Sequence, residues 1–376
     1  MSIQGSVFQY ITFSVFIISL LIQLFFWLRY YLKSSAPAPS TVDESKPPVS
    51  VIICARNEAV NLREHLPAVL QQDYSDYEVI VVNDCSEDDS DMVLSELKVQ
   101  FPHLKISTIK KDPLFHHNKK LAQIIGIKAA TNDILLFTDA DCRPVSDKWI
   151  ALMTSHLRNE KTIVLGYGGY NHGKGLLNRY IRYDAMFIAM QYLGRALRGL
   201  PYMGVGRNLA YRKSLFLSSN GFSKHYHIAS GDDDLFVNAN ANKQNTAAET
   251  GPGSHTRSVP AGSFNDLLRQ KQRHMSTAGM YRTRDKFMLI VEPISRLLFY
   301  ASFVLSLVTE YLWPVATGLF FVRLITMVIV LSRAGRRFDD RDLTFPALFF
   351  DLVAPFINSL FYLSALGNKG KKKPWR

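Results

Sequence analysis

Residues 134–143 read ILLFTDADCR, and this stretch decides the fold. Four apolar residues predict a buried strand, and two carboxylates, Asp139 and Asp141, follow it one residue apart. Side chains at positions i and i+2 of an extended chain point to the same face, so both carboxylates can converge on one point. A divalent cation suits such a pair, although an acidic turn after a strand gives the same pattern.

Strands and helices alternate around this stretch. Short β-branched runs predict strands at residues 49–54, 78–82 and 105–109. Helical spacing of apolar residues predicts helices between them, at 61–72, 92–97 and 119–130. This alternation predicts an α/β fold with a doubly wound, mostly parallel sheet. The carboxyl ends of parallel strands meet at one edge, where ligands bind.

Apolar segments flank the α/β region. Residues 7–32 carry no charge before Arg29 and are long enough to span a bilayer, which predicts an uncleaved transmembrane anchor. Two further spans are predicted at about 290–309 and 312–331. Residues 345–366 are also apolar but contain Asp351, Pro355 and Asn358. That last run either spans the membrane or lies at its surface.

The charge balance points to a membrane and not to nucleic acid. The formal net charge is +12, but basic residues cluster beside the apolar runs, as at residues 333–337 and 369–376. This is the pattern of cytoplasmic loops in membrane proteins, so we predict an inner or plasma membrane protein whose catalytic domain is cytoplasmic. Three cysteines without metal-ligand spacing fit a reducing compartment.

These patterns divide the chain into four parts. We expect an anchor at residues 1–33 and a linker rich in proline and serine at 34–48. An α/β domain at 49–285 follows, and the chain ends in a membrane region with a basic tail at 286–376.

Two stretches of the second half carry chemistry. Asp232, Asp233 and Asp234 are adjacent and precede an apolar run. Crowded carboxylates raise one another's pKa, which suits a general base, although capping of the next helix is the alternative. Gln270 and Arg273 are three residues apart, so one helix can present both to the same site. A basic helix lying on the membrane surface is the alternative for this second stretch.

In this order, the motifs VSVIICARNEAVNL, EVIVVNDCSEDDS, NKKLAQIIGIKAA and ILLFTDADC resemble those of family 2 glycosyltransferases. The resemblance covers roughly residues 49–280 and implies the GT-A nucleotide-sugar fold. It implies that the domain at 49–285 is catalytic, with a nucleotide-sugar half at 49–145 and an acceptor half at 146–285. It also implies that Glu58 and Asp84 contact the nucleoside of the donor, and that Asp139 and Asp141 hold Mg²⁺ or Mn²⁺ on the diphosphate.

The same resemblance places Lys119 near the donor, although Asn118 replaces the glycine of the family motif. It places Arg207 and Asn208, which follow a small-residue loop, beside the acceptor. Gln270 is expected at the acceptor, and Arg273 is expected at the donor diphosphate.

In the acidic stretch, Asp232 corresponds to the glutamate of the family's Glu-Asp motif and Asp233 to the catalytic base. Asp234 is kept as an acceptor-side residue and as the reserve base. His274 stands where the family has tryptophan, which argues against processive polymer synthesis.

We therefore predict an inverting transferase that moves a sugar from a nucleoside-diphosphate sugar to a glycan or lipid-linked hydroxyl at the membrane. A UDP-sugar is favoured over a GDP-sugar, and a role in cell-envelope polysaccharide is expected. Two alternatives remain: a transferase acting on polyprenyl phosphate, and a non-catalytic membrane scaffold.

Overall fold

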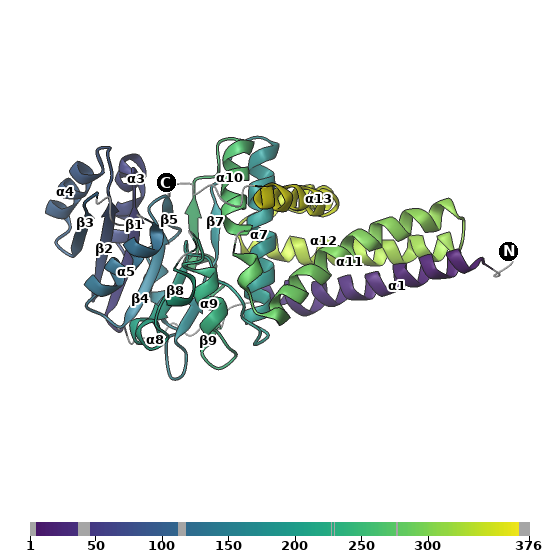
Figure 1. Cartoon of the computed structure of the whole chain (residues 1–376), viewed down its shortest axis with the longest axis horizontal. Coiled ribbons are helices and arrows are strands. Elements are labelled where there is room, and N and C mark those ends of the chain that lie inside the picture. Colours follow the sequence, from purple (N-terminus) through teal and green to yellow (C-terminus); the bar gives the residue numbers. More distant parts are fainter. Residues whose placement is uncertain are drawn as a thin grey trace.

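The computed structural model describes residues 5–36, 46–111, 118–226, 228, 230–275 and 277–367. Most of the expected linker, at 37–45, and the basic tail at 369–376 lie outside the described residues. An α/β domain occupies one end of the molecule, and long helices extend from it (Figure 1).

Within the described residues, seven strands form the main sheet, in the order β3-β2-β1-β4-β8-β6-β9. Their bounds are β1 (Val49–Ala55), β2 (Tyr77–Asp84), β3 (Leu104–Ile109), β4 (Ile134–Asp139), β6 (Ile163–Leu165), β8 (Leu209–Arg212) and β9 (Thr246–Ala248). The strands from β3 to β4 are parallel, as predicted, and β8 is antiparallel to both its neighbours, β4 and β6. A smaller sheet, not predicted, joins β5 (Cys142–Pro144), β10 (Thr256–Ser258) and β7 (Gly168–Tyr170).

Helices cover both faces of the main sheet. In the α/β domain they are α3 (Ala59–Leu70), α4 (Ser90–Gln100), α5 (Lys119–Ala129), α6 (Trp149–Thr154), α7 (Leu176–Ala196), α8 (Lys213–Ser218), α9 (Asp234–Asn240) and α10 (Phe264–Met275). Successive β1 side chains enter opposite cores: Val51 packs in the cluster that contains α3 and α4, whereas Ile52 packs in the one that contains α5. This period-2 burial confirms the doubly wound sheet.

Three long helices form what we call the bundle: α1 (Val7–Phe26), α11 (Thr283–Val308) and α12 (Trp313–Arg337). Helix α1 continues through a π-helix, η1 (Trp27–Tyr31), into α2 (Leu32–Ser34). The three helices run side by side away from the α/β domain, so the bundle has a base at the domain and a distal tip (Figure 1). All three are long and apolar enough to cross a membrane.

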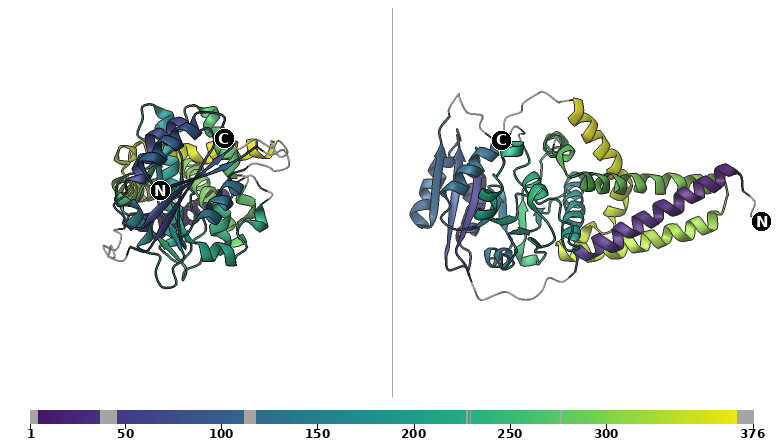
Figure 2. Two further views of the ribbon diagram at one scale, coloured as in Figure 1. Left: turned by 90° about the vertical axis from the view of Figure 1, so that its left-hand side faces the viewer. Right: turned by 60° about the horizontal axis from the view of Figure 1, so that its bottom comes forward.

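The last helix, α13 (Pro346–Gly367), also meets the length and composition of a span, but it runs across the bundle base instead of along the bundle (Figure 2). One face packs on the protein through Ala347, Phe350, Ala354 and Phe361. The opposite face exposes an apolar stripe at helical spacing, made of Phe345, Phe349, Leu352, Phe356, Leu360 and Leu363. This orientation favours a helix that lies at the membrane surface.

A buried polar network joins α13 to the bundle. Arg323 of α12 donates to Asp351 of α13 at 2.8 Å and to Gln23 of α1 at 2.8 Å. Arg296 of α11 lies 3.4 Å from Asp351 and pairs with Glu292 at 2.5 Å. The two arginines and two carboxylates balance in charge, which is what burial away from water requires.

Candidate active site

The strand registers bring the predicted nucleotide-binding residues to one edge of the sheet. Cys54 of β1 pairs with Asp139 of β4, and Ala55 pairs with Asn83 of β2, so these strands end level with one another. Asp84 ends β2 and is fully buried. Glu58 follows β1, and its backbone N–H donates to Ser90 at 3.1 Å.

Glu58 shares this edge with the paired carboxylates. Burial, reinforced by the nearby charges of Asp141 and Asp139, raises the pKa of Glu58 to about 7. The Glu58 side chain itself accepts a hydrogen bond from Asn61 at 2.6 Å. Glu58 is thus a residue of the same sheet edge whose carboxyl group is influenced by the paired carboxylates.

Lys119, at the start of α5, bridges two acidic groups that are far apart in the sequence. Its ammonium donates to Asp139 at 2.7 Å and lies 3.5 Å from Asp232. Although burial opposes ionisation of Asp139, the positive charge of Lys119 lowers the pKa of this carboxyl group, and Arg207 and Arg273 add to the effect. Asp139 is thus held as a carboxylate, the form that binds a cation.

The residues at this point fit a divalent ion. Oxygen atoms of Asp139 and Asp141 lie within 4.8 Å of each other and of the Cys142 sulfur. Ser258 of β10 donates to Asp141 at 2.7 Å and so orients its second oxygen. Two carboxylates at the rim of a polar site suit Mg²⁺ or Mn²⁺ better than a soft metal, and burial keeps the Cys142 thiol protonated by raising its pKa.

Asp233 has the environment of a general base. Burial, followed by the charges of Asp232 and Asp234, raises the pKa of Asp233 to about 7. The backbone N–H of Gly206 donates to one of its oxygens at 2.6 Å, which fixes the side chain. A Cβ at Gly206 would meet both Asp233 and the Lys119 ammonium, so the small residue leaves room where these groups converge.

Asp234 does not share that position. Its carboxylate accepts hydrogen bonds from Thr277 at 2.5 Å and from Tyr281 at 2.7 Å, and the side chain is buried. Both partners follow α10 in the chain. Asp234 thus anchors the segment after α10, and we do not retain it as a reserve base or acceptor ligand.

Asn208 is also placed beneath the site and not in it. Its side chain accepts from the Trp149 indole at 3.0 Å and donates to the carbonyls of Tyr167 and Ser254 at 2.9 and 2.7 Å. It is fully buried. With these bonds made, Asn208 has a supporting role, which corrects the expectation of an acceptor contact.

Arg207 and Gln270 meet at a tyrosine that the sequence did not single out. The Arg207 guanidinium lies over the Tyr170 ring, 4.3 Å from its centroid, and Gln270 donates to the Tyr170 hydroxyl at 3.0 Å. Thr138 donates to the Arg207 carbonyl at 3.0 Å, which ties this residue to β4. Tyr170 lies in the glycine-rich stretch 166–175, whose composition was the only sequence signal for it.

Gln270 and Arg273 lie on one helix, α10, as their spacing predicts. The charge of Arg273 acts on Asp139, which places it on the same side of the site as the metal-binding residues. The described contacts join Lys119 to Asp139 and Asp232 and join Arg207 to Gln270 through Tyr170, whereas Asp84 is fully buried at the end of β2.

The family model described as glycosyl transferase family 2 matches residues 50–218, which contain β1 to β8 and the carboxylate pair. Residues 50–218 therefore form a family 2 glycosyltransferase domain. The chain is 27% identical over 228 residues to the probable glycosyltransferase YdaM of Bacillus subtilis, an alignment that covers 58% of this chain and 54% of YdaM. It thus spans about half the length of that relative.

A second curated relative is glycosyltransferase AglE of Haloferax volcanii, 28% identical over 233 residues, which are 60% of this chain and 71% of AglE. A solved structure, the mannosyltransferase PcManGT from Pyrobaculum calidifontis in complex with GDP-Man and Mn²⁺, matches with a TM-score of 0.59 and 18% identity. That match covers 92% of this chain and 98% of the other. The transferase therefore has the GT-A fold.

Proposed function

We propose that the transferase is an inverting enzyme that moves a sugar from a nucleoside-diphosphate sugar to a hydroxyl of a glycan or lipid-linked acceptor at the membrane. The observation that carries this proposal is the Lys119 bridge. Lys119 lies 2.7 Å from Asp139 and 3.5 Å from Asp232, the residue before the candidate base Asp233, which supports one shared site for the donor and the base. The solved mannosyltransferase complex with GDP-Man and Mn²⁺ supports a donor of this class.

On the donor side, Glu58 and Asp84 would accept hydrogen bonds from the base and ribose of the nucleotide. Asp139 and Asp141 would hold Mg²⁺ or Mn²⁺, which supplies positive charge to the diphosphate when bound. Arg273, through its guanidinium, would stabilise the charge that develops on the departing diphosphate.

On the acceptor side, Asp233 removes the proton of the attacking hydroxyl. The hydroxyl oxygen forms a bond to the anomeric carbon, and the bond from that carbon to the diphosphate oxygen breaks. Attack from the face opposite the leaving group inverts the configuration at that carbon. Arg207 and Gln270, which both contact Tyr170, would orient the acceptor.

A donor-binding panel tests the function without knowledge of the acceptor. UDP, GDP and CDP are titrated into the detergent-purified transferase with and without Mn²⁺, and we expect one nucleotide, UDP in our prediction, to bind only with the metal. A folded protein that binds none of them would contradict the proposal. Binding of GDP in place of UDP would correct only the predicted nucleobase of the donor.

The pH dependence of transfer follows from Asp233. Its pKa of about 7 means that the carboxyl group is protonated, and inactive as a base, below neutral pH. At saturating donor we expect the transfer rate to rise between pH 6 and 8 with a midpoint near 7, and to fall about tenfold per unit at lower pH. Glu58 also titrates near pH 7, so donor binding is measured in parallel at each pH. A rate that is flat over this range, with donor bound, would exclude Asp233 as the base.

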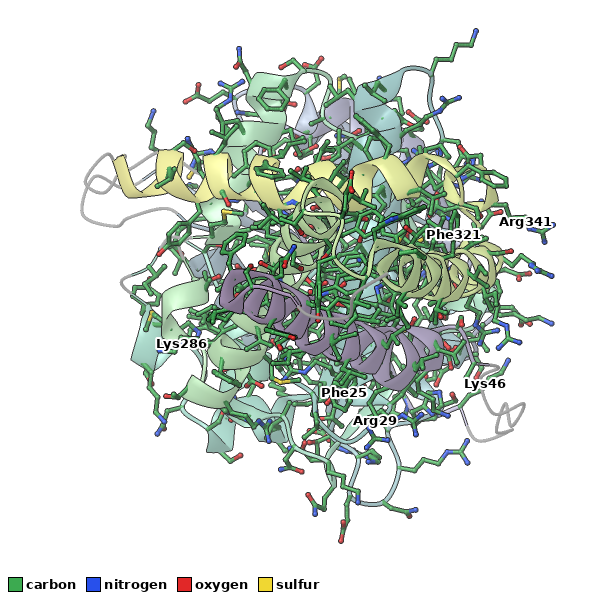
Figure 3. All side chains as sticks on the ribbon, turned by 90° about the vertical axis from the view of Figure 1, so that its right-hand side faces the viewer. Phe25, Arg29, Lys46, Lys286, Phe321 and Arg341 are labelled. Atoms are coloured by element: carbon green, nitrogen blue, oxygen red, sulfur yellow. The ribbon has the colours of Figure 1, made fainter. Side chains whose placement is uncertain are left out.

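We also propose that the α/β domain and both ends of α13 lie on the cytoplasmic side. Basic side chains lie at the base of the bundle: Arg29 just after α1, Lys286 in the first turn of α11 and Arg341 just after α12 (Figure 3). Because cytoplasmic flanks carry such residues, the base is the cytoplasmic end. The turn between α11 and α12, near Glu310, is then on the far side.

Reporter fusions test this topology. We expect green fluorescent protein fused after residue 376 to fluoresce, and alkaline phosphatase at the same place to be inactive. A cysteine introduced at Glu310 should react with a membrane-impermeant maleimide added outside the cell. An active phosphatase at the C-terminus would show that α13 spans the membrane.

A further inference from the structure

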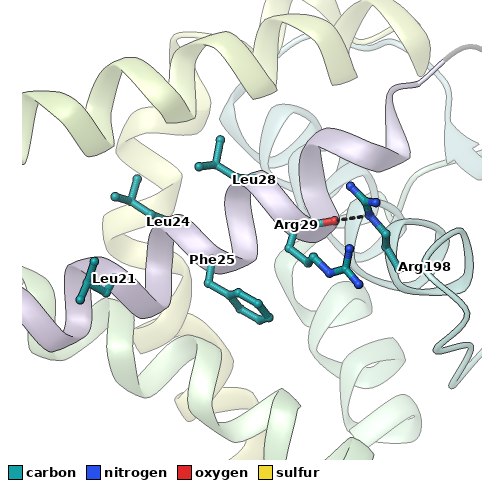
Figure 4. A pocket seen from close by; sticks show the side chains of 6 residues that line it. All are labelled: Leu21, Leu24, Phe25, Leu28, Arg29 and Arg198. Carbon is teal, nitrogen blue, oxygen red and sulfur yellow. Dashed lines mark hydrogen bonds between the residues drawn. The ribbon is translucent and has the colours of Figure 1, made fainter.

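A groove of about 400 Å³ lies where α1 enters the bundle base, well apart in sequence from the residues of the transfer site. Leu21, Leu24, Phe25 and Leu28 form its apolar wall, and Arg29 and Arg198 close one end (Figure 4). The groove therefore has an apolar wall along part of its lining and a cationic group at one end.

The cationic end brings two positive groups together. Arg198, just after α7, donates from its Nε to the backbone carbonyl of Arg29 at 3.0 Å. Both arginines are exposed, and across the described part of the chain no carboxylate lies within ion-pair distance of either. Two arginines that line the same groove without a counter-charge attract an anion, and the planar fork of arginine matches a phosphate.

The backbone holds this arrangement in place. The helix containing Arg29 widens into the π-helix η1 (Trp27–Tyr31), a feature that often marks functional positions. On the facing helix α7, a Cβ at Gly194 would collide with the carbonyl of Tyr30, so only glycine allows α7 to approach this closely. The two arginines are therefore presented by elements in direct backbone contact.

The apolar wall faces where lipid would be. Leu21, Phe25 and Leu28 are about half exposed, at 61%, 49% and 50%, on a helix that meets the criteria of a membrane span. Arg29 belongs to the basic side chains at the base of the bundle (Figure 3). The groove therefore starts beside acyl chains and ends at the depth of headgroups.

We propose that this groove binds one anionic phospholipid of the leaflet on the catalytic-domain side. The phosphate would accept hydrogen bonds from Arg29 and Arg198, and an acyl chain would lie along Leu21, Leu24 and Leu28. Such a lipid neutralises the arginine pair and connects α1 to α7, so it stabilises the junction between the bundle and the α/β domain.

Native mass spectrometry of the full, delipidated chain tests the proposal, with phosphatidylglycerol and phosphatidylcholine as probes. We expect phosphatidylglycerol to bind in preference and to raise the melting temperature. The double variant R29Q/R198Q should bind it about 25-fold more weakly, since each basic residue at an anionic surface contributes about 1 kcal/mol, or roughly fivefold. R29Q alone keeps the bond from Arg198, because its acceptor is a backbone oxygen, and should lose about half of that effect on a logarithmic scale.

The matched control is R333Q/R336Q, which removes the same charge from exposed positions of α12 outside the groove and should bind as the wild type does. Leu24→Trp places a larger side chain in the groove, keeps both arginines and should also weaken binding. Equal binding of both phospholipids, or an unchanged R29Q/R198Q, would overturn the proposal. Displacement by inorganic phosphate, or tighter binding of a prenyl phosphate than of phosphatidylglycerol, would assign the groove to another ligand and overturn it as well.

Discussion

Replacing Asp233 by asparagine is expected to reduce the transfer rate by about 10²- to 10⁴-fold, the usual contribution of a general base, while nucleotide binding stays within about twofold. The two oxygens of Asp233 accept from the Gly206 N–H at 2.6 Å and from the Asp234 N–H at 2.7 Å, and the single asparagine oxygen can keep one of these bonds. The variant loses the ability to take a proton together with the other bond. Transfer is measured under saturating donor, and binding of the nucleotide is measured by calorimetry on the same preparation.

Two comparisons make this result specific. D147N changes an exposed aspartate of the same domain and should leave both quantities unchanged. D234N removes an anchor of Thr277 and Tyr281 and should lower the melting temperature without abolishing transfer. Near wild-type turnover of D233N would exclude Asp233 as the base and would favour a lipid phosphate acceptor, because such an acceptor needs no base.

Replacing Asp139 by asparagine is expected to weaken Mn²⁺-dependent nucleotide binding about 100-fold or more, equivalent to roughly 3 kcal/mol. The variant loses a carboxylate ligand of the metal. The Lys119 ammonium, which lies 2.7 Å from Asp139 in the wild type, also loses its main counter-charge. The transfer rate should fall together with the affinity for the nucleotide. Titration of nucleotide at several Mn²⁺ concentrations separates a metal defect from a nucleotide defect.

The contrast with Asp141→Asn sharpens that result. Asp141 receives a hydrogen bond from Ser258 but none of the described contacts joins it to Lys119, so its replacement removes a metal ligand and leaves the lysine bridge intact. In both variants we expect Mn²⁺ to strengthen nucleotide binding less than it does in the wild type. If D139N binds nucleotide with wild-type metal dependence, Asp139 and Asp141 do not hold the ion.

The sequence predicted the parts of the site that depend on neighbouring residues. Four apolar residues before Asp139 specify a strand, and the i, i+2 spacing places Asp141 near it. The positions of Asn208 and Asp234 were not predictable in this way. Their hydrogen-bond partners, such as Ser254 and Tyr281, lie tens of residues away, and local spacing carries no information on them.

Hydropathy was equally unable to fix the orientation of α13. Residues 345–366 have a composition that suits a span or a surface helix, because both need the same number of apolar side chains. Contacts with distant parts of the chain decide the direction of α13. Asp351 meets Arg296 and Arg323, and the ring centroid of Phe361 lies 5.8 Å from that of Phe264 in α10.

The same polar network sets a constraint on biogenesis. Arg323 lies on α12, a candidate membrane span, and its carboxylate partner, Asp351, is made 28 residues later. During translation of that interval the cation has no neutralising carboxylate on α13. We therefore expect α12 to pass from the insertion machinery into lipid only after α13 supplies Asp351.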